Sequence, residues 1–231
     1  MNNKKPKIID VNTLSPEERN IHFHQMAEDS RTLELLLHTC FNNGITPVLA
    51  SKGHGKNTLS YIILTLDKKH LNTIGRLIDL VEEIPNTEFN IRSNNSEDLY
   101  AELFCDCKDS EQLFTRVKEI VEEDILESAS SHNLTLMNTI YNIAKIVCTI
   151  TEANILFATN ESLYSQGKCG VSFYKEGQSV KISKKKAIDI EKVIRTLKET
   201  VTLNLPTVFF CSFEELRTFY FELDEVVYGQ E

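Results

Sequence analysis

The chain has 231 residues, of which 41% are hydrophobic and 26% are charged, and its formal net charge is -9. This composition is typical of a globular protein and excludes a chain that is disordered throughout, and no apolar run reaches the roughly 20 residues needed to cross a bilayer. The acidic balance opposes binding to a nucleic-acid backbone, because such binding needs basic residues gathered on one face. The gathered basic run at Lys181–Lys186 is interpreted as the solvated start of a helix.

The N-terminal sequence and the cysteines indicate the compartment. The first ten residues, MNNKKPKIID, lack the apolar stretch of a secretory signal peptide, so we expect a reducing, cytoplasmic location. The six cysteines are scattered among apolar residues, where free cysteine behaves as a small hydrophobe. We therefore expect mostly buried thiols, and the sequence predicts no cofactor and no metal site.

The first two predicted elements are helices. Ser15 is expected to cap the first one, with Pro16 at the first helical position and Glu18 completing a capping box. A second helix is predicted from Ser30, with apolar residues at helical spacing, and Asn43-Gly44 supplies a left-handed stop.

The stretch that follows, Ile45–Asp67, reads as a hairpin. Two apolar runs, 45–50 and 59–66, flank a Gly-His-Gly-Lys loop, and the second run is rich in β-branched residues. Pro47 cannot donate a ladder hydrogen bond, which predicts that the first run lies at a sheet edge or that its early part is unpaired. Asp67 is then expected to cap one long helix that ends before Pro85.

A second hairpin and a helix complete the first half. Alternation resumes at Thr87, passes through the polar turn SNNSED and continues to Phe104, and a helix follows from Asp109 or Ser110. The order helix, hairpin, helix, hairpin, helix predicts an α+β fold in which helices cover a sheet. By analogy at the level of the fold, we expect a ferredoxin-like layer.

The acidic and then small, polar segment Glu122–Asn133 is the best candidate boundary. We predict a flexible lead over 1–14, a first α+β domain over 15–127 and a second α+β half over 128–231, which either stands apart or packs on the first as one unit. The second half is expected to contain a helix over Leu134–Ile150, a strand over Ile155–Thr159, a hairpin over Gly170–Ser183, a helix from Ser183, a strand over Thr207–Cys211 and a final helix with a capping box at Ser212 and Glu215.

The hairpin loop is the first candidate site. It invites comparison with a phosphate-binding P-loop, but Ala50 replaces the first glycine and Asn57 replaces the hydroxyl residue that would bind magnesium. A weaker hypothesis remains, in which exposed amides and side chains bind a small anion or the carboxylate of a partner. The predicted ligand-binding residues are Ser51, Gly53, His54, Gly55 and Lys56; the alternative is a loop whose glycines only permit the turn.

Cysteine chemistry is the second candidate. Cys169 lies between Lys168 and Gly170, which could lower the pKa of its thiol and open access to it. No histidine follows it in the chain, so its base would have to be His54, His70 or His132, brought close by the fold. Cys105 and Cys107 share a face if their strand extends through both, but they lack the second paired motif of a structural zinc site. The alternative for all three is that they are structural residues, in a turn or in the core.

The C-terminal segment FEELRTFYFELDEVVYGQE resembles the acidic C-terminal signals of bacterial effectors exported by type IV secretion. That resemblance implies an exported effector without a classical signal peptide. A packed amphipathic helix explains the same residues, and it would leave Phe221 off the buried stripe.

Three functions follow. Absence of a catalytic signature favours a cytoplasmic binding or regulatory module that acts through a protein partner, self-association or a small anionic ligand. The alternative is an enzyme with a dispersed site around His54, Lys56 and either Cys169 or Cys105. The minor alternative is the exported bacterial effector.

Overall fold

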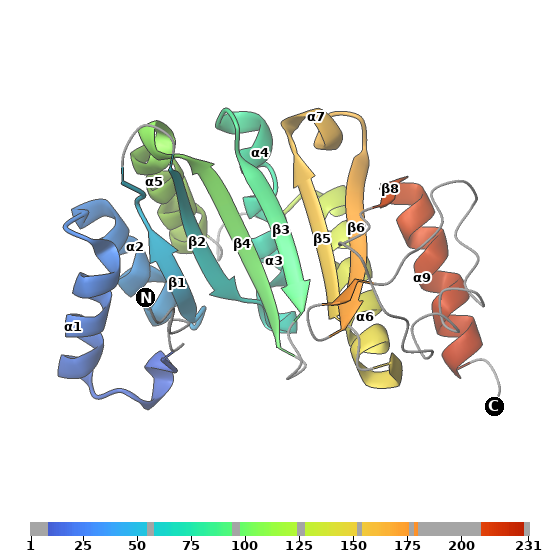
Figure 1. Cartoon of the computed structure of the whole chain (residues 1–231), viewed down its shortest axis with the longest axis horizontal. Helices are drawn as coiled ribbons and strands as arrows, with labels where there is room; N and C mark the ends of the chain where they lie inside the picture. Colours follow the sequence, from blue (N-terminus) through green and yellow to red (C-terminus); the bar gives the residue numbers. More distant parts are fainter. Residues whose placement is uncertain are drawn as a thin grey trace.

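The computed structural model describes residues 9–54, 58–93, 98–123, 128–151, 154–175, 178–179 and 209–228. These residues form a mixed α+β fold in which one sheet of eight strands carries a layer of helices, as Figure 1 shows. The α+β class predicted from the sequence is therefore confirmed, whereas the ferredoxin-like arrangement stays a prediction.

All strand pairs in the described part of the sheet are antiparallel. The strand order is β1-β2-β4-β3-β5-β6-β7, and β8 also pairs with β6. The strands are β1 (Pro47–Ser51), β2 (Leu59–Thr65), β3 (Glu88–Ser93), β4 (Leu99–Asp106), β5 (Asn154–Asn160), β6 (Lys168–Lys175), β7 (Gln178–Ser179) and β8 (Phe209–Ser212). Because β3 pairs with β5, the sheet runs continuously from the first half of the chain into the second.

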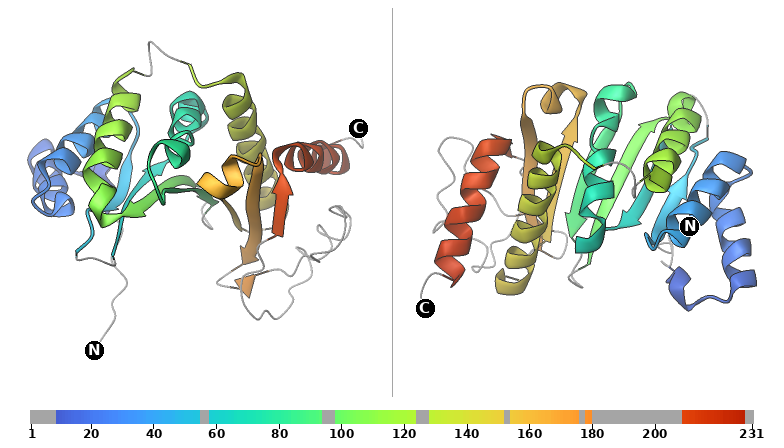
Figure 2. Two further views of the ribbon diagram at one scale, coloured as in Figure 1. Left: turned by 90° about the horizontal axis from the view of Figure 1, so that it is seen from above. Right: turned by 180° about the vertical axis from the view of Figure 1, so that it is seen from behind.

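The described helices lie on one side of this sheet or beyond its ends, as Figure 2 shows from above and from behind. They are η1 (Val11–Thr13), α1 (Pro16–Ala27), α2 (Arg31–Asn42), η2 (Lys68–His70), α3 (Leu71–Leu77), α4 (Leu80–Glu83), η3 (Cys107–Asp109), α5 (Ser110–Glu123), α6 (Ser131–Thr151), α7 (Glu161–Tyr164) and α9 (Phe213–Tyr228). None of them is both long and apolar enough to span a membrane.

The local signals that start helices act as the sequence predicts. Ser15 caps α1, and Glu18 returns a hydrogen bond to the Ser15 amide. These bonds lower the pKa of Glu18. The same box recurs at α9, where the Ser212 hydroxyl accepts from the amide of Glu215 at 3.1 Å and the Glu215 carboxylate accepts from the amide of Ser212 at 2.6 Å. Each cap satisfies amides that a helix start leaves free.

The core lies between the sheet and its helices. Strand alternation sends every second side chain into it, and the apolar stripes of the helices meet them there. The largest side chains that are wholly buried in it are Phe23, Phe89, Phe114, Phe157, Phe173 and Phe219. The opposite sheet face is free of described helices, as the front of Figure 1 shows.

One predicted helix is broken. The segment expected to be one helix from Asp67 to Pro85 contains η2, α3 and α4, and the Asp67 side chain makes no capping hydrogen bond. Around Asp79 the chain tightens to i→i−3 hydrogen bonds. The Asp79 carboxylate accepts from Asn133 at 2.7 Å and from the Tyr164 hydroxyl at 2.8 Å. These long-range bonds offer a physical reason for the break.

The second half agrees with its predicted elements where it is described. The helix expected over 134–150 is α6, the strand expected over 155–159 is β5, and the strand expected over 207–211 begins at Phe209. The hairpin predicted over 170–183 is visible as β6 and β7. Its last residues, and the helix predicted from Ser183, fall outside the described ranges.

Candidate functional site

The predicted ligand-binding loop begins at the end of β1, and its described residues gather around Glu28. The Ser51 hydroxyl donates to the Glu28 carboxylate at 3.1 Å, and Nε2 of His54 lies 3.2 Å from the same oxygen. Glu28 directly follows α1 and has a left-handed backbone, with φ of 51°. Ser51 and His54 therefore already contact the carboxylate of Glu28.

The rest of this loop is a tight turn. Gly53 has φ of 74°, and its amide donates to the Ser51 hydroxyl. A Cβ at this position would lie 3.0 Å from the Leu59 carbonyl oxygen, which explains the glycine. Gly55 and Lys56 lie outside the described residues, so their predicted ligand contacts stay predictions.

Cys105 and Cys107 do not lie on one face of a strand, because the strand does not extend through both. β4 ends at Asp106, so Cys105 points into the core, whereas Cys107 begins η3 and its thiol donates to the Lys52 carbonyl at 3.1 Å. Burial raises the pKa of Cys105 to about 12. Among the described residues, no group of three or more His, Cys, Asp or Glu side chains is arranged to hold a metal ion.

Cys169 is fully buried in β6, and its Sγ lies 3.6 Å from Sγ of Cys211 in β8. The contact with Cys211, together with burial, raises the pKa of the Cys169 thiol far above its ordinary value. A nucleophilic cysteine needs the opposite shift and an exposed thiolate. The geometry therefore gives no support to Cys169 as a nucleophile in the reduced, folded chain.

A surface that the sequence did not predict lies on the sheet face that no described helix covers. We call it the open face and define it by Leu59, Tyr61 and Ile63 of β2, Arg92 of β3, and Tyr100, Glu102 and Phe104 of β4. The register places Tyr61 opposite Phe104, with ring centroids 6.0 Å apart. Leu59 is 55% exposed, and Tyr61, Ile63 and Phe104 are half-buried. Side chains of this size are normally covered when they sit together on a sheet.

An ion pair occupies the centre of the open face. Glu102 lies between Ile63 of β2 and Asn90 of β3 in the register, and it is only 3% exposed. Nη2 of Arg92 donates to its carboxylate at 3.0 Å, while nearly half of the Arg92 side chain remains exposed. Burial raises the pKa of Glu102, and Arg92 and a hydrogen bond with Asn90 oppose that rise.

The open face also carries a buried acceptor atom and two acids at its border. Among the described atoms, Oδ1 of Asn90 is buried without a hydrogen-bond donor. Such an atom is costly unless a donor reaches it. Glu88 is exposed beside Phe104, and Asp106 faces Leu59 at the end of the strand pair.

The loop and the open face are neighbours. Ser51 is paired with Tyr61, and Tyr61 is paired with Phe104, so one row of the sheet runs from the Glu28 cluster onto the aromatic pair. Burial, and secondarily the negative charge of Glu28, raise the pKa of Tyr61. The sequence indicated the alternation in β2 and β4, but it did not indicate that the described helices would leave this face uncovered.

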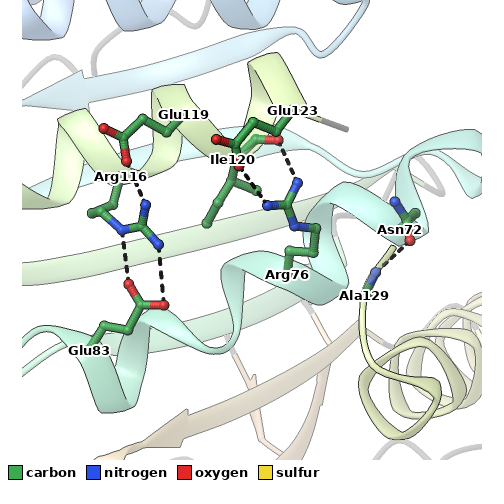
Figure 3. A network of polar contacts seen from close by, with 8 residues as sticks. All are labelled: Asn72, Arg76, Glu83, Arg116, Glu119, Ile120, Glu123 and Ala129. Atoms are coloured by element: carbon green, nitrogen blue, oxygen red, sulfur yellow. Dashed lines mark hydrogen bonds and ion pairs between the residues drawn. The ribbon is translucent and has the colours of Figure 1, made fainter. Parts of the chain in front are cut away.

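The ion pairs on the helical side have a different character. Figure 3 shows Arg116 of α5 between Glu83 and Glu119, at 2.9 and 2.5 Å, and Arg76 of α3 paired with Glu123 at 3.0 Å. Hydrogen bonds to both acids raise the pKa of Arg116. These groups link α5 to α3 and α4, so we assign them a structural role.

The fold and the site together define an α+β protein with an open, partly apolar sheet face. Comparisons with protein-family descriptions, curated proteins and solved structures gave no match to this chain.

Proposed function

We propose that this chain is a binding module that docks a protein partner on the open face of its sheet. The observation that carries the proposal is that large apolar side chains lie together, the exposed Leu59 beside the half-buried Tyr61 and Phe104, on a face that no described helix covers. Contiguous exposed apolar surface is costly in water, and aromatic residues are enriched in protein interfaces.

Charge and hydrogen bonding specify the partner's chemistry. The border of the open face carries two acids, Glu88 and Asp106, of which Asp106 also lies 4.0 Å from Nζ of Lys108. The Arg92 charge at the centre is matched by Glu102. A second copy would set like charges against each other, so we propose a different protein whose apolar patch is bordered by Lys or Arg. Its donors would also satisfy the carbonyl oxygen of Asn90.

The other functions are less well supported. An anion at the loop would meet the Glu28 carboxylate beside Ser51 and His54. A thiol enzyme would need a thiolate, yet burial raises the pKa of Cys105 and Cys169. The hypothesis of an exported effector stays a prediction. The described part of the C-terminal segment is α9, and burial of its Leu216 and Phe219 against the core is another explanation for its apolar residues. A ferredoxin-like layer and a regulatory, cytoplasmic role belong to the proposal as well.

The test uses a phage-displayed library of random peptides, selected on the full-length chain. We expect peptides rich in apolar residues and in Lys or Arg, whose binding weakens when salt is raised. The double variant Tyr61→Ala/Phe104→Ala should bind them at least about tenfold more weakly, equivalent to about 1.4 kcal/mol. Leu35→Ala is the matched control, because Leu35 is 47% exposed on α2, away from the open face.

Two results would contradict the proposal. One is a set of peptides that binds the double variant and the native chain equally well. The other is that the native chain selects no peptide from the library although circular dichroism shows that it is folded. Binding of inorganic phosphate tests the alternative of an anion site at the loop. That hypothesis expects the native chain and the double variant to bind phosphate, and His54→Ala to lose this binding.

A further inference from the structure

Two buried thiols meet across the last strand pair. Cys169 and Cys211 are directly opposite each other in the register of β6 and β8, although they are 42 positions apart in the chain. Their Sγ atoms are 3.6 Å apart, and the Cys169 thiol also lies 3.7 Å from the Cys211 carbonyl oxygen. Both side chains point to the core side, where Cys169 is fully buried and Cys211 is 6% exposed.

This geometry satisfies the main requirement of a disulfide. Opposite residues in an antiparallel pair have Cα atoms about 4.5 or 5.5 Å apart, and disulfides need roughly 4.4–6.8 Å. The two sulfur atoms must approach each other by roughly 1.5 Å to bond, which side-chain rotation can supply without moving the strands apart. The thiol of Cys107, by contrast, donates to the Lys52 carbonyl at 3.1 Å.

We propose that Cys169 and Cys211 are a reversible dithiol–disulfide pair that closes on reaction with a small-molecule disulfide such as oxidised glutathione. The closed form links β8, and with it α9, covalently to the centre of the second half of the sheet. This modification site is independent of the open face, because both thiols lie on the opposite side of the sheet from Tyr61 and Phe104.

The reaction balances through two exchanges. The thiolate of Cys211, the more exposed of the two, attacks one sulfur of oxidised glutathione and expels one glutathione thiolate. Cys169 then loses its proton and attacks the Cys211 sulfur of the mixed disulfide, which expels the second glutathione. The two cysteines lose two electrons and two protons in total, and the small disulfide takes them up as two thiols.

Access is expected to need a local opening of β8. This strand has four residues, and among the described strands it pairs with β6 alone. A short strand at the end of a sheet opens more easily than the sheet's centre. Oxidation is therefore expected to be slow in the native chain and faster at urea concentrations that leave the rest of the sheet folded.

The experiment keeps the full chain in glutathione buffers of increasing oxidising strength. Free thiols are alkylated after acid quenching, and tryptic peptides are mapped by mass spectrometry. We expect a linked peptide containing Cys169 and Cys211, an intact mass lower by about 2 Da, and a midpoint of thermal unfolding raised by roughly 10 °C. Amide exchange in α9 should slow by at least about tenfold, because the disulfide restrains its opening.

Matched variants identify the pair. Cys107→Ser should retain the linked peptide and the thermal shift, whereas Cys211→Ser should lose both. The mapping of the native chain decides the matter even where a variant fails to fold. Two results would overturn the proposal. In one, all six cysteines can still be alkylated in fully oxidised glutathione, and in the other, the linked peptide contains a different cysteine.

Discussion

The two faces of the sheet contrast sharply although they are built from the same strands. In β4, Ala101 and Leu103 on the helix side are about 1% exposed, whereas Tyr100 and Phe104 on the other side remain half-buried. The strand residues on the helix side are mostly apolar, with a few buried hydroxyl residues such as Ser60 and Ser93, and the open face mixes aromatic and aliphatic side chains with the pair of Arg92 and Glu102.

The contrast separates stability from recognition. A side chain on the helix side is surrounded by packed neighbours, so its removal leaves a cavity. A side chain on the open face borders solvent, so its removal costs less, and its remaining exposed surface is available to a partner. The same strand register therefore supplies a core on one side and a docking surface on the other.

The largest effect is expected from truncating neighbouring phenylalanines on the two faces. Phe89 of β3 is fully buried in the core, where it is paired with Leu103 of β4. Phe104 directly follows Leu103 and lies on the open face. Phe89→Ala should lower the free energy of unfolding by about 3–5 kcal/mol, and Phe104→Ala by roughly 1 kcal/mol. Urea denaturation followed by circular dichroism measures both, and equal losses would show that the open face is packed like the core.

A smaller effect is expected from the polar network on the helix side. The Tyr164 hydroxyl lies 2.7 Å from Oδ1 of Asn133, which is 1% exposed, and 2.8 Å from Oδ1 of Asp79. The one hydroxyl proton of Tyr164 can serve only one of these two acceptors at a time, so Tyr164→Phe removes one donor from this partly buried network and should cost about 1–3 kcal/mol. Tyr228→Phe is the control, because Tyr228 is 59% exposed and its change should cost almost nothing.

The pH dependence of the same network adds a second measurement. Burial, and then the hydrogen bond to Asp79, raise the pKa of Tyr164 above its ordinary value of 10.0. The folded chain therefore holds this proton more tightly than the unfolded chain, so its stability falls as pH rises above about 10. Tyr164→Phe should flatten that fall, and an unchanged alkaline profile would contradict the burial of this hydroxyl.

Short-range signals account for what the sequence predicted well. The capping boxes at Ser15 and Ser212 act within four residues, so a pattern in the sequence is also a contact in space. Alternation located the strands of both early hairpins, and Pro47 correctly placed β1 at the edge of the described sheet.

Long-range contacts account for what it missed. Glu28 approaches Ser51 and His54 only because α1 ends beside β1, and no periodicity in either segment indicates that meeting. The pairing of Cys169 with Cys211 depends equally on the placement of β8 beside β6. The buried ion pair of Arg92 and Glu102 could not be predicted, because charged residues in a strand normally indicate a solvated face.

The smallest effect is expected from Glu102, and it tests whether the carboxyl group at the centre of the open face is buried. Burial raises the pKa of Glu102 above its ordinary value of 4.5, so the folded chain binds this proton more tightly than the unfolded chain. The contribution of Glu102 to stability should therefore decrease as pH rises from about 4.5 through the raised pKa, and Glu102→Gln should remove that decrease. At neutral pH the substitution is expected to change the free energy of unfolding by less than about 1 kcal/mol, because loss of the Arg92 pair offsets relief of the buried charge. Urea denaturation of both chains between pH 4 and pH 8, at roughly one-unit steps, measures the difference. Parallel profiles would mean that Glu102 is hydrated in the folded chain, and the open face would then lack the dry centre that a protein partner requires.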